Sequence, residues 1–299
     1  MLSSNKIFSL GSLFFIVFIT TLRADNLRLI REKSFQAKDW ENVYVNASGA
    51  DVKVDSLDKA ETYVKIFANR RAEDRFKFSI EQEDNTVKVI AKKRGSFFSW
   101  FGGGFDVRIE IKVPKNHNAH VETSGGDIYL SNLFGVFKLD TSGGDIVITN
   151  TDGKLRAETS GGDITLNKHK GEMNLSTSGG DIVCKESSGD ISAETSGGDI
   201  KLEIADGKIN AETSGGDIEI FYNGVNKGFE AETSGGDIHV KLSSGFKANA
   251  HFETSGGSIK NNFSNSRSIK TSRSEQDVEF NGGGVKLRLE TSGGDIIVE

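Results

Sequence analysis

Residues 193–200 read Ala-Glu-Thr-Ser-Gly-Gly-Asp-Ile, and most of the chain consists of copies of this stretch. The aspartate of its Ser-Gly-Gly-Asp-Ile core returns at steps of 18 residues, followed by one step of 20 and one of 21. The successive positions are Asp127, Asp145, Asp163, Asp181, Asp199, Asp217, Asp237 and Ser258, where serine replaces aspartate. A last copy occupies residues 291–296. A fixed period near 20 residues is typical of a solenoid, in which each repeat is one coil stacked on the previous one.

One repeat, residues 163–180, shows how such a coil is built. Aliphatic residues alternate with polar ones from Ile164, residues 168–171 turn the chain, and a second alternating stretch leads to Thr177 and a paired-glycine turn. Alternation with period two indicates strands with one buried and one exposed face. The sequence therefore predicts an all-β fold, a single-stranded parallel β-helix (β-solenoid) with coils of about 18 residues.

The chain before the regular repeats also predicts strands. Residues 47–54 read Ala-Ser-Gly-Ala-Asp-Val-Lys-Val, a worn copy of the repeat core. We interpret residues 25–120 as a strand-rich N-terminal portion of the solenoid and residues 121–299 as its regular repeats. Near residues 261–280 a polar stretch predicts an irregular excursion, and residues 291–299 are expected to form the end coil. The strands predicted in the N-terminal portion are 43–45, 63–67, 76–80, 87–90 and 107–113.

Residues 1–24 have the pattern of a targeting segment. Lys6 precedes an apolar run over residues 7–19, and small residues lead to Ala24. This arrangement is typical of a cleaved signal peptide, with a retained N-terminal anchor as the alternative. Either interpretation predicts an exported protein of the periplasm, the cell envelope or the extracellular space. The anchor would also bring the chain into contact with a membrane.

The amino-acid composition excludes several classes of function. The 35 glycines with only one proline indicate many tight turns, and the net charge of −6, with both signs interleaved, offers no basic patch for nucleic acid. Cys184 is the only cysteine, which excludes an intramolecular disulfide and a cysteine-based zinc site. The five histidines are scattered, without a serine or cysteine partner at a catalytic spacing. We therefore expect no enzyme activity and no required cofactor.

Strand alternation points the repeat aspartates outward and the repeat threonines inward. Two interpretations of the aspartates stay open: each carboxylate bonds the amides of its own turn, or the row binds calcium, which prefers clustered carboxylate oxygens. A second row of acids, including Glu194, also points outward. The candidate calcium row is Asp127, Asp145, Asp163, Asp181, Asp199, Asp217 and Asp237.

An aromatic, glycine-rich stretch at residues 97–105 breaks the strand alternation and is flanked by basic residues. We interpret it as the tip of a long hairpin. It either folds back over the open end of the solenoid core or presents an apolar patch to lipid or to a partner. The candidate interaction residues are Phe97, Phe98, Trp100, Phe101 and Phe105.

Together, the exported N-terminus, the repeated Thr-Ser-Gly-Gly-Asp-Ile strands, the aromatic-glycine loop and the terminal copy at 291–296 resemble the bacterial adhesin-like β-strand-repeat proteins. That family is a domain of unknown function related to head-GIN adhesin-like domains, and the resemblance covers about residues 35–299. It implies a right-handed single-stranded β-helix with a surface or envelope role, and it supplies no catalytic residues.

From these features we expect a non-enzymatic scaffold that binds an unknown surface ligand, either a protein or a glycan. Its contact surface would be the outward Asp/Glu rows or the aromatic hairpin. The first alternative is a calcium-stabilised binding module that uses the acidic rows. The second alternative is a carbohydrate-active enzyme on a β-helix.

Overall fold

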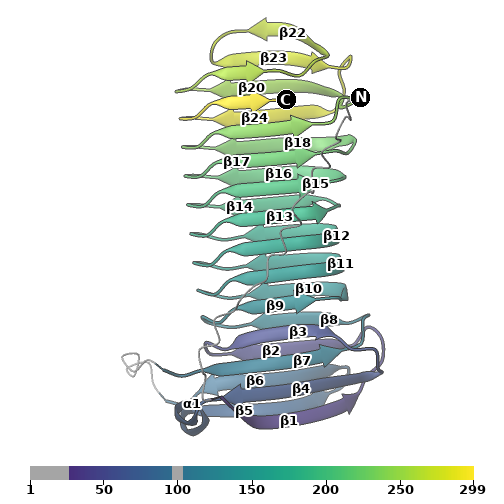
Figure 1. Ribbon diagram of the computed structural model, residues 1–299, viewed down its shortest axis with the longest axis vertical. Coiled ribbons are helices and arrows are strands. Elements are labelled where there is room, and N and C mark those ends of the chain that lie inside the picture. Colours follow the sequence, from purple (N-terminus) through teal and green to yellow (C-terminus); the bar gives the residue numbers. More distant parts are fainter. Residues whose placement is uncertain (1–26, 96–103) are drawn as a thin grey trace, which may run out of the picture.

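A computed structural model describes residues 27–95 and 104–299 of the chain. The fold is all-β and solenoid-like: strands lie across a tall stack, with the N-terminal portion at one end and the C-terminal strands at the other (Figure 1). The segments 1–24 and 97–101, with their predicted targeting and interaction roles, fall outside the described residues. Among the described residues, no helix is long and apolar enough to cross a membrane.

The middle of the stack follows the sequence order. Its strands are β8 (Asn118–Glu122), β9 (Ile128–Ser131), β10 (Phe134–Asp140), β11 (Ile146–Glu158), β12 (Ile164–Ser176), β13 (Ile182–Ser187), β14 (Ile191–Thr195), β15 (Ile200–Ile204), β16 (Gly207–Thr213), β17 (Ile218–Tyr222), β18 (Asn226–Thr233) and β19 (Ile238–Leu242). They form two columns of parallel strands, and equivalent residues of successive coils lie side by side, as Ile146, Ile164 and Ile182 do. These isoleucines are buried and form a continuous core.

Paired glycines bring the coils into contact at the corner before each repeat aspartate. A Cβ on Gly180 would lie 2.0 Å from the carbonyl oxygen of Gly162 in the preceding coil, so a side chain cannot be accommodated there. The opposite corner, where the sequence showed only variable turns, has a glycine column of its own. Gly171 has a φ of +127°, and its Cβ would lie 1.9 Å from the carbonyl oxygen of Gly153. Glycine is needed there for both space and backbone conformation.

The N-terminal end is interleaved. Its elements are β1 (Arg28–Gln36), β2 (Asn42–Ala47), β3 (Asp51–Ser56), β4 (Glu61–Ala68), α1 (Arg70–Arg75), β5 (Phe76–Glu83), β6 (Thr86–Lys93) and β7 (Val107–Val113). The coil made of β2 and β3 pairs in parallel with β8 and β9 on one side and with β6 and β7 on the other. Antiparallel pairing of β5 with β6, β4 with β7 and β1 with β4 then ends the stack.

Two features of this N-terminal end differ from the sequence expectation. The strands from β2 to β7 were anticipated, but the short helix α1 was not; the Asn69 side chain caps it by accepting a hydrogen bond from the amide of Ala72. Strand β1 was also missed, because most of its residues are exposed and show little apolar alternation. It forms an outer antiparallel edge, where burial does not impose a pattern on the sequence.

The C-terminal end contains β20 (Ala248–Thr254), β21 (Ile259–Asn261), β22 (Ser266–Thr271), β23 (Glu275–Phe280), β24 (Lys286–Thr291) and β25 (Ile296–Val298). The last strands, β24 and β25, lie between β18–β19 and β20–β21. The expectation that residues 291–299 form the end coil is therefore wrong. The stack ends with β23 antiparallel to β20 and β22 antiparallel to β23, in the stretch predicted as an excursion (Figure 1).

Candidate functional site

The repeat aspartates form an exposed row along one corner of the stack. The Oδ1 atom of each accepts the backbone N–H of the aspartate in the next coil; for example, Asp181 N lies 2.9 Å from Asp163 Oδ1. The expectation that each carboxylate bonds its own turn is therefore wrong, because the acceptor and the donor belong to different coils. The same bond joins all seven predicted residues, Asp127, Asp145, Asp163, Asp181, Asp199, Asp217 and Asp237.

The row continues beyond the predicted residues at both ends. Asp51 accepts the amide of Asp127, and Asp295 follows Asp237 in space. Ser258 donates its own amide to Asp295 and is the last position of the row. Among the described residues, no further copy of the motif stacks beyond Ser258. No amide of a next coil therefore needs an aspartate oxygen at this position, and serine can replace aspartate there. The worn copy at 47–54 signalled Asp51 in the sequence, whereas the order of Asp295 and Ser258 needed the structure.

The repeat threonines are buried beneath this corner, as the alternation predicted. The Thr159 hydroxyl donates to the carbonyl oxygen of Gly144 in the preceding coil at 2.9 Å. It also accepts the amide of Gly162 in its own turn at 3.3 Å. The hydroxyls thus bond to backbone groups of two coils, which satisfies polar atoms that burial would otherwise penalise.

A second acidic row crosses the flat outward face of the other strand column. In spatial order it comprises Glu122, Asp140, Glu158, Ser176, Glu194, Glu212, Glu232, Glu290, Glu253 and Glu275. We call this set the glutamate row. Its six last members are glutamates on six neighbouring strands, because the inserted strand β24 places Glu290 between Glu232 and Glu253.

Ion pairs offset part of this charge. Arg288 contacts Glu230, Glu232 and Glu290, and Lys270 contacts Glu275. Glu194 and Glu212 are exposed and have no ion pair with any described residue. Like charges on adjacent strands repel by roughly 1 kcal/mol in water. The middle of the glutamate row is therefore the part of this face most open to a cation or a cationic partner.

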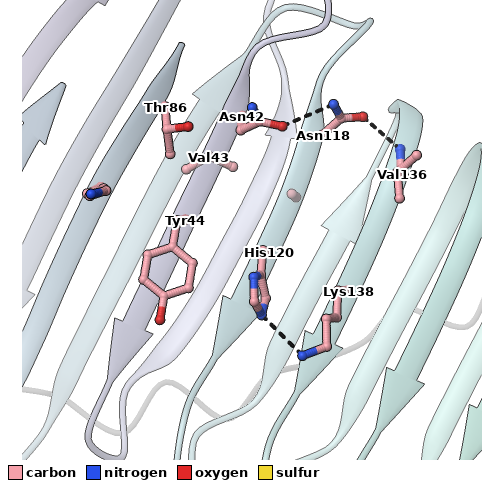
Figure 2. Close-up of a pocket in the computed structure, with 10 residues that line it drawn as sticks. Asn42, Val43, Tyr44, Thr86, Asn118, His120, Val136 and Lys138 are labelled. Atoms are coloured by element: carbon pink, nitrogen blue, oxygen red, sulfur yellow. Dashed lines mark hydrogen bonds between the residues drawn. The ribbon is translucent and has the colours of Figure 1, made fainter. Parts of the chain in front are cut away.

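The same face hollows into an open groove of about 460 Å³ near the N-terminal end (Figure 2). Asn42, Asn118 and the amide of Val136 are joined by hydrogen bonds along its upper edge. Below them, the Tyr44 ring meets the His120 ring edge-on at 5.0 Å. The sequence did not signal this groove, because part of its lining comes from distant strands: Asn42 and Asn118 lie side by side although they are 76 residues apart in the sequence.

Tyr44 and His120 connect the groove to the first member of the glutamate row. The Tyr44 hydroxyl donates to Glu122 at 3.0 Å, and partial burial raises the pKa of this phenol. His120 Nε2 lies 3.0 Å from Glu122 and 3.5 Å from the Lys138 ammonium. The groove thus presents an aromatic ring, amides and paired charges, which are groups that bind polar ligands.

Of the aromatic candidates, Phe97, Phe98, Trp100 and Phe101 lie outside the described residues. Phe105 is partly buried and packs against the core, with its ring 5.8 Å from that of Phe76 and with the Lys93 ammonium over its face at 4.6 Å. Phe105 therefore contributes to the packing of the N-terminal end.

The buried titratable side chains of the stack include Cys184, His117 and His169. Burial raises the pKa of the Cys184 thiol to about 12, which suits a small core residue rather than a reactive thiol. Burial lowers the pKa of His117 to about 4 and also lowers that of His169. His169 is paired through Nδ1 with the Thr151 hydroxyl at 2.9 Å. Neither His117 nitrogen has a hydrogen-bond partner within residues 27–95 and 104–299.

Comparison with known proteins places the chain in a family. It belongs to the Toastrack DUF4097 family, which matches residues 40–299. This agrees with the resemblance to adhesin-like repeat proteins noted in the sequence. No curated protein matches.

Several solved structures are similar to this chain at low sequence identity. One, described as a "putative adhesin" from Parabacteroides merdae ATCC 43184, is 12% identical, with a TM-score of 0.45 over 92% of this chain and 97% of the other. A second, described as a "putative lipid binding protein" from Parabacteroides distasonis ATCC 8503, is 14% identical, with a TM-score of 0.44 over 92% and 98% of the two chains. A "putative adhesin" from Bacteroides fragilis NCTC 9343 is 12% identical, with a TM-score of 0.37 over 91% and 97%.

Proposed function

We propose that the chain is an exported, non-enzymatic β-solenoid, a single-stranded parallel β-helix, that acts as an adhesin-like binding scaffold of the cell envelope or cell surface. The observation that supports this role best is the glutamate row, which holds carboxylates in register across a flat outward face. A rigid, repeated array of one chemical group suits binding of an extended surface ligand. The adhesin and lipid-binding names of the similar structures describe roles of the same kind.

The ligand class that best fits this face is a cationic or polar surface polymer, protein or glycan. The free carboxylates of Glu194 and Glu212 would pair with cations of the ligand, and the Tyr44–His120 groove would take a polar group at the N-terminal end of the same face. Because exposed ion pairs are individually weak, affinity would come from many aligned contacts. Binding should therefore weaken steeply as the salt concentration rises.

The test is binding of the purified chain to immobilised glycans and to intact bacterial cells at low and high salt. We expect Glu194→Gln with Glu212→Gln to reduce retention several-fold, while Glu203→Gln, the same change at an exposed site on β15 in the other strand column, leaves it unchanged. Equal binding by both variants would show that the glutamate row is not the contact surface. Fractionation of native cells with N-terminal sequencing of the mature chain tests export and cleavage after Ala24.

A calcium-stabilised module is the second candidate, and the unpaired Glu194 and Glu212 favour it more than the aspartate row does. Each repeat aspartate already gives one oxygen to a backbone amide, whereas these glutamates have both oxygens available. Calcium binding to the folded chain would raise its melting temperature. No change in melting at millimolar calcium would exclude this candidate.

A further inference from the structure

A histidine surrounded by carboxylates lies near the C-terminal end of the stack. It is close to the coil made of β24 and β25, which we call the inserted C-terminal coil. His251 on β20 has Asp277 of β23 directly opposite on one side, and its neighbour Glu253 has Glu290 of β24 opposite on the other. His251 is half-buried. Side chains from three strands, β20, β23 and β24, thus meet around one imidazole.

The hydrogen bond of His251 fixes its tautomer. Nδ1 lies 2.8 Å from Asp277 Oδ1, and an ionised carboxylate can only accept, so Nδ1 carries the proton. The lone pair of the neutral ring is therefore on Nε2. That atom lies 3.6 Å from Glu253 Oε2 and 3.9 Å from Glu290 Oε1, distances too long for hydrogen bonds. The lone pair and the two carboxylates thus converge without bonding one another.

Glu290 is held in place by a second group. Its other oxygen, Oε2, accepts a hydrogen bond from Arg288, which leaves Oε1 toward the histidine. Glu253 has no described ion-pair partner apart from His251. His251 Nε2 and one carboxylate oxygen each of Glu253 and Glu290 therefore lie within 4.8 Å of one another. His251 and Glu290 are held in place by other residues, Asp277 and Arg288, and not by hydrogen bonds among these three atoms.

We propose that His251, Glu253 and Glu290 form a binding site for a divalent first-row transition ion of the zinc class, with Asp277 as the positioning residue of the histidine. Zinc–nitrogen and zinc–oxygen bonds of about 2.0–2.2 Å in a tetrahedral site put ligand atoms roughly 3.3–3.6 Å apart, so only small shifts are needed. The Asp277–His251 bond is the carboxylate–histidine arrangement that orients metal-bound imidazoles. A nitrogen ligand favours such an ion over calcium.

A similar cluster at the other end of the same face provides a contrast. His120 Nε2 lies 3.0 Å from Glu122 and 3.8 Å from Asp140. There the Lys138 ammonium lies 3.5 Å from Nε2 and 3.2 Å from Asp140, so a cation of the chain itself already occupies the centre. At His251 the cation of the chain is Arg288, which lies opposite His251 on β24 but pairs with the Oε2 atom of Glu290. Among the described residues no lysine or arginine pairs with Glu290 Oε1 or with Glu253, so a metal ion can bind between these oxygens and His251 Nε2.

A metal ion at this site would join β20 to β24, the first strand of the inserted C-terminal coil. Because the ligands come together only when the inserted coil is in place, binding would stabilise the closed C-terminal end and not the open chain. Metal binding would therefore stabilise the C-terminal end of the stack, where the order of the coils does not follow the order of the repeats in the sequence.

The test is calorimetric titration of Zn²⁺ into the full chain after chelator treatment, with Co²⁺ absorption as a spectroscopic check of nitrogen ligation. We expect one ion per chain, loss of that ion in His251→Ala, and roughly 10- to 100-fold weaker binding in Asp277→Asn. His120→Ala is the matched control and should bind as the parent chain does. Zn²⁺ should raise the melting temperature of the parent and not that of His251→Ala.

Glu253→Gln keeps the shape of an exposed side chain, so it distinguishes the loss of a metal ligand from misfolding of the variant. It should weaken Zn²⁺ binding while its circular dichroism and metal-free melting match those of the parent. The proposal is overturned if the parent chain binds no Zn²⁺ at 100-fold molar excess, or if His251→Ala binds it as tightly as His120→Ala. A calcium effect that persists in His251→Ala would belong to the glutamate row.

Discussion

The middle of the stack and its two ends are built from the same kind of coil but are specified differently. Between β10 and β17, each coil pairs with the coils before and after it in the sequence, and equivalent residues lie side by side. At both ends, a coil distant in the sequence is inserted: β2–β3 next to β8–β9, and β24–β25 next to β18–β19. Antiparallel strands then cover the outermost coils.

The difference shows what a repeat can and cannot encode. Nearest-neighbour contacts between identical coils suffice for the middle, as in other repeat proteins. An end needs a surface that does not recruit another coil, since an unpaired strand edge promotes association. Here both ends are covered by antiparallel strands of non-repeat sequence, and the inserted coils bind the end segments to the rest of the stack.

Removing the inserted C-terminal coil should have the largest effect. A chain that stops at Gly283 lacks β24 and β25, so β18 and β20 lose their shared partner. We expect the amides of β20 and β23 to exchange with solvent at least ~100-fold faster, measured by hydrogen exchange with mass spectrometry. Deletion of residues 164–181 removes one complete middle coil and should preserve protection at both ends. Equal loss in both variants would show that the ends are not special.

A methyl group at the coil contact should destabilise the middle next most strongly. In Gly180→Ala the new Cβ would meet the backbone of Gly162 at 2.0 Å, and we expect a loss of about 4 kcal/mol or more in the free energy of unfolding. In Gly179→Ala the nearest atom is 3.7 Å away, and the change should stay within about 0.5 kcal/mol. Denaturant titration of both variants measures the difference, and similar midpoints would contradict the close contact.

Lowering the pH should destabilise the fold at the junction between the N-terminal end and the middle of the stack. His117 is fully buried, and burial lowers its pKa from 6.5 to about 4, so the folded chain keeps it neutral while the unfolded chain takes up a proton. Its contribution to stability is therefore complete above about pH 6.5 and is lost as the pH falls toward 4, by about 3 kcal/mol.

His117→Leu should remove this part of the pH dependence. Denaturant titrations at intervals between pH 7 and pH 4 measure it, with the parent chain as reference. The prediction fails if the variant loses stability over this interval as steeply as the parent does. His169, whose pKa burial also lowers, contributes in the same direction and remains in both chains.

The smallest effect is expected at a single position of the aspartate row. Asp199→Ala removes the acceptor for the amide of Asp217 and should cost about 1 kcal/mol. Asp199→Asn keeps an acceptor oxygen and removes a charge from the row, so its melting temperature should equal or exceed that of the parent. A larger loss in Asn than in Ala, in calcium-free buffer, would show that the charge itself is needed.

The candidate surfaces were only partly predictable from the sequence. The period revealed the outward aspartates, from Asp127 to Asp237, because a fixed step and strand alternation determine which residues share a corner. It did not show that each carboxylate bonds the next coil, since that depends on the separation of the coils. The Tyr44–His120 groove and the extension of the glutamate row through Glu290, Glu253 and Glu275 arise from strands that meet only in the folded chain.

The sequence by itself determined the repeated coil: its length, its inward isoleucines and threonines, and its paired-glycine corner, because these are local features that each copy repeats. The tertiary structure decided the order of the coils at both ends, the place of Ser258 at the end of the aspartate row, and the meeting of His251 with Glu290. Parallel pairing depends on register and not on distance along the chain. Two coils with the same pattern are therefore equally acceptable neighbours, and only closure of the whole stack selects among them.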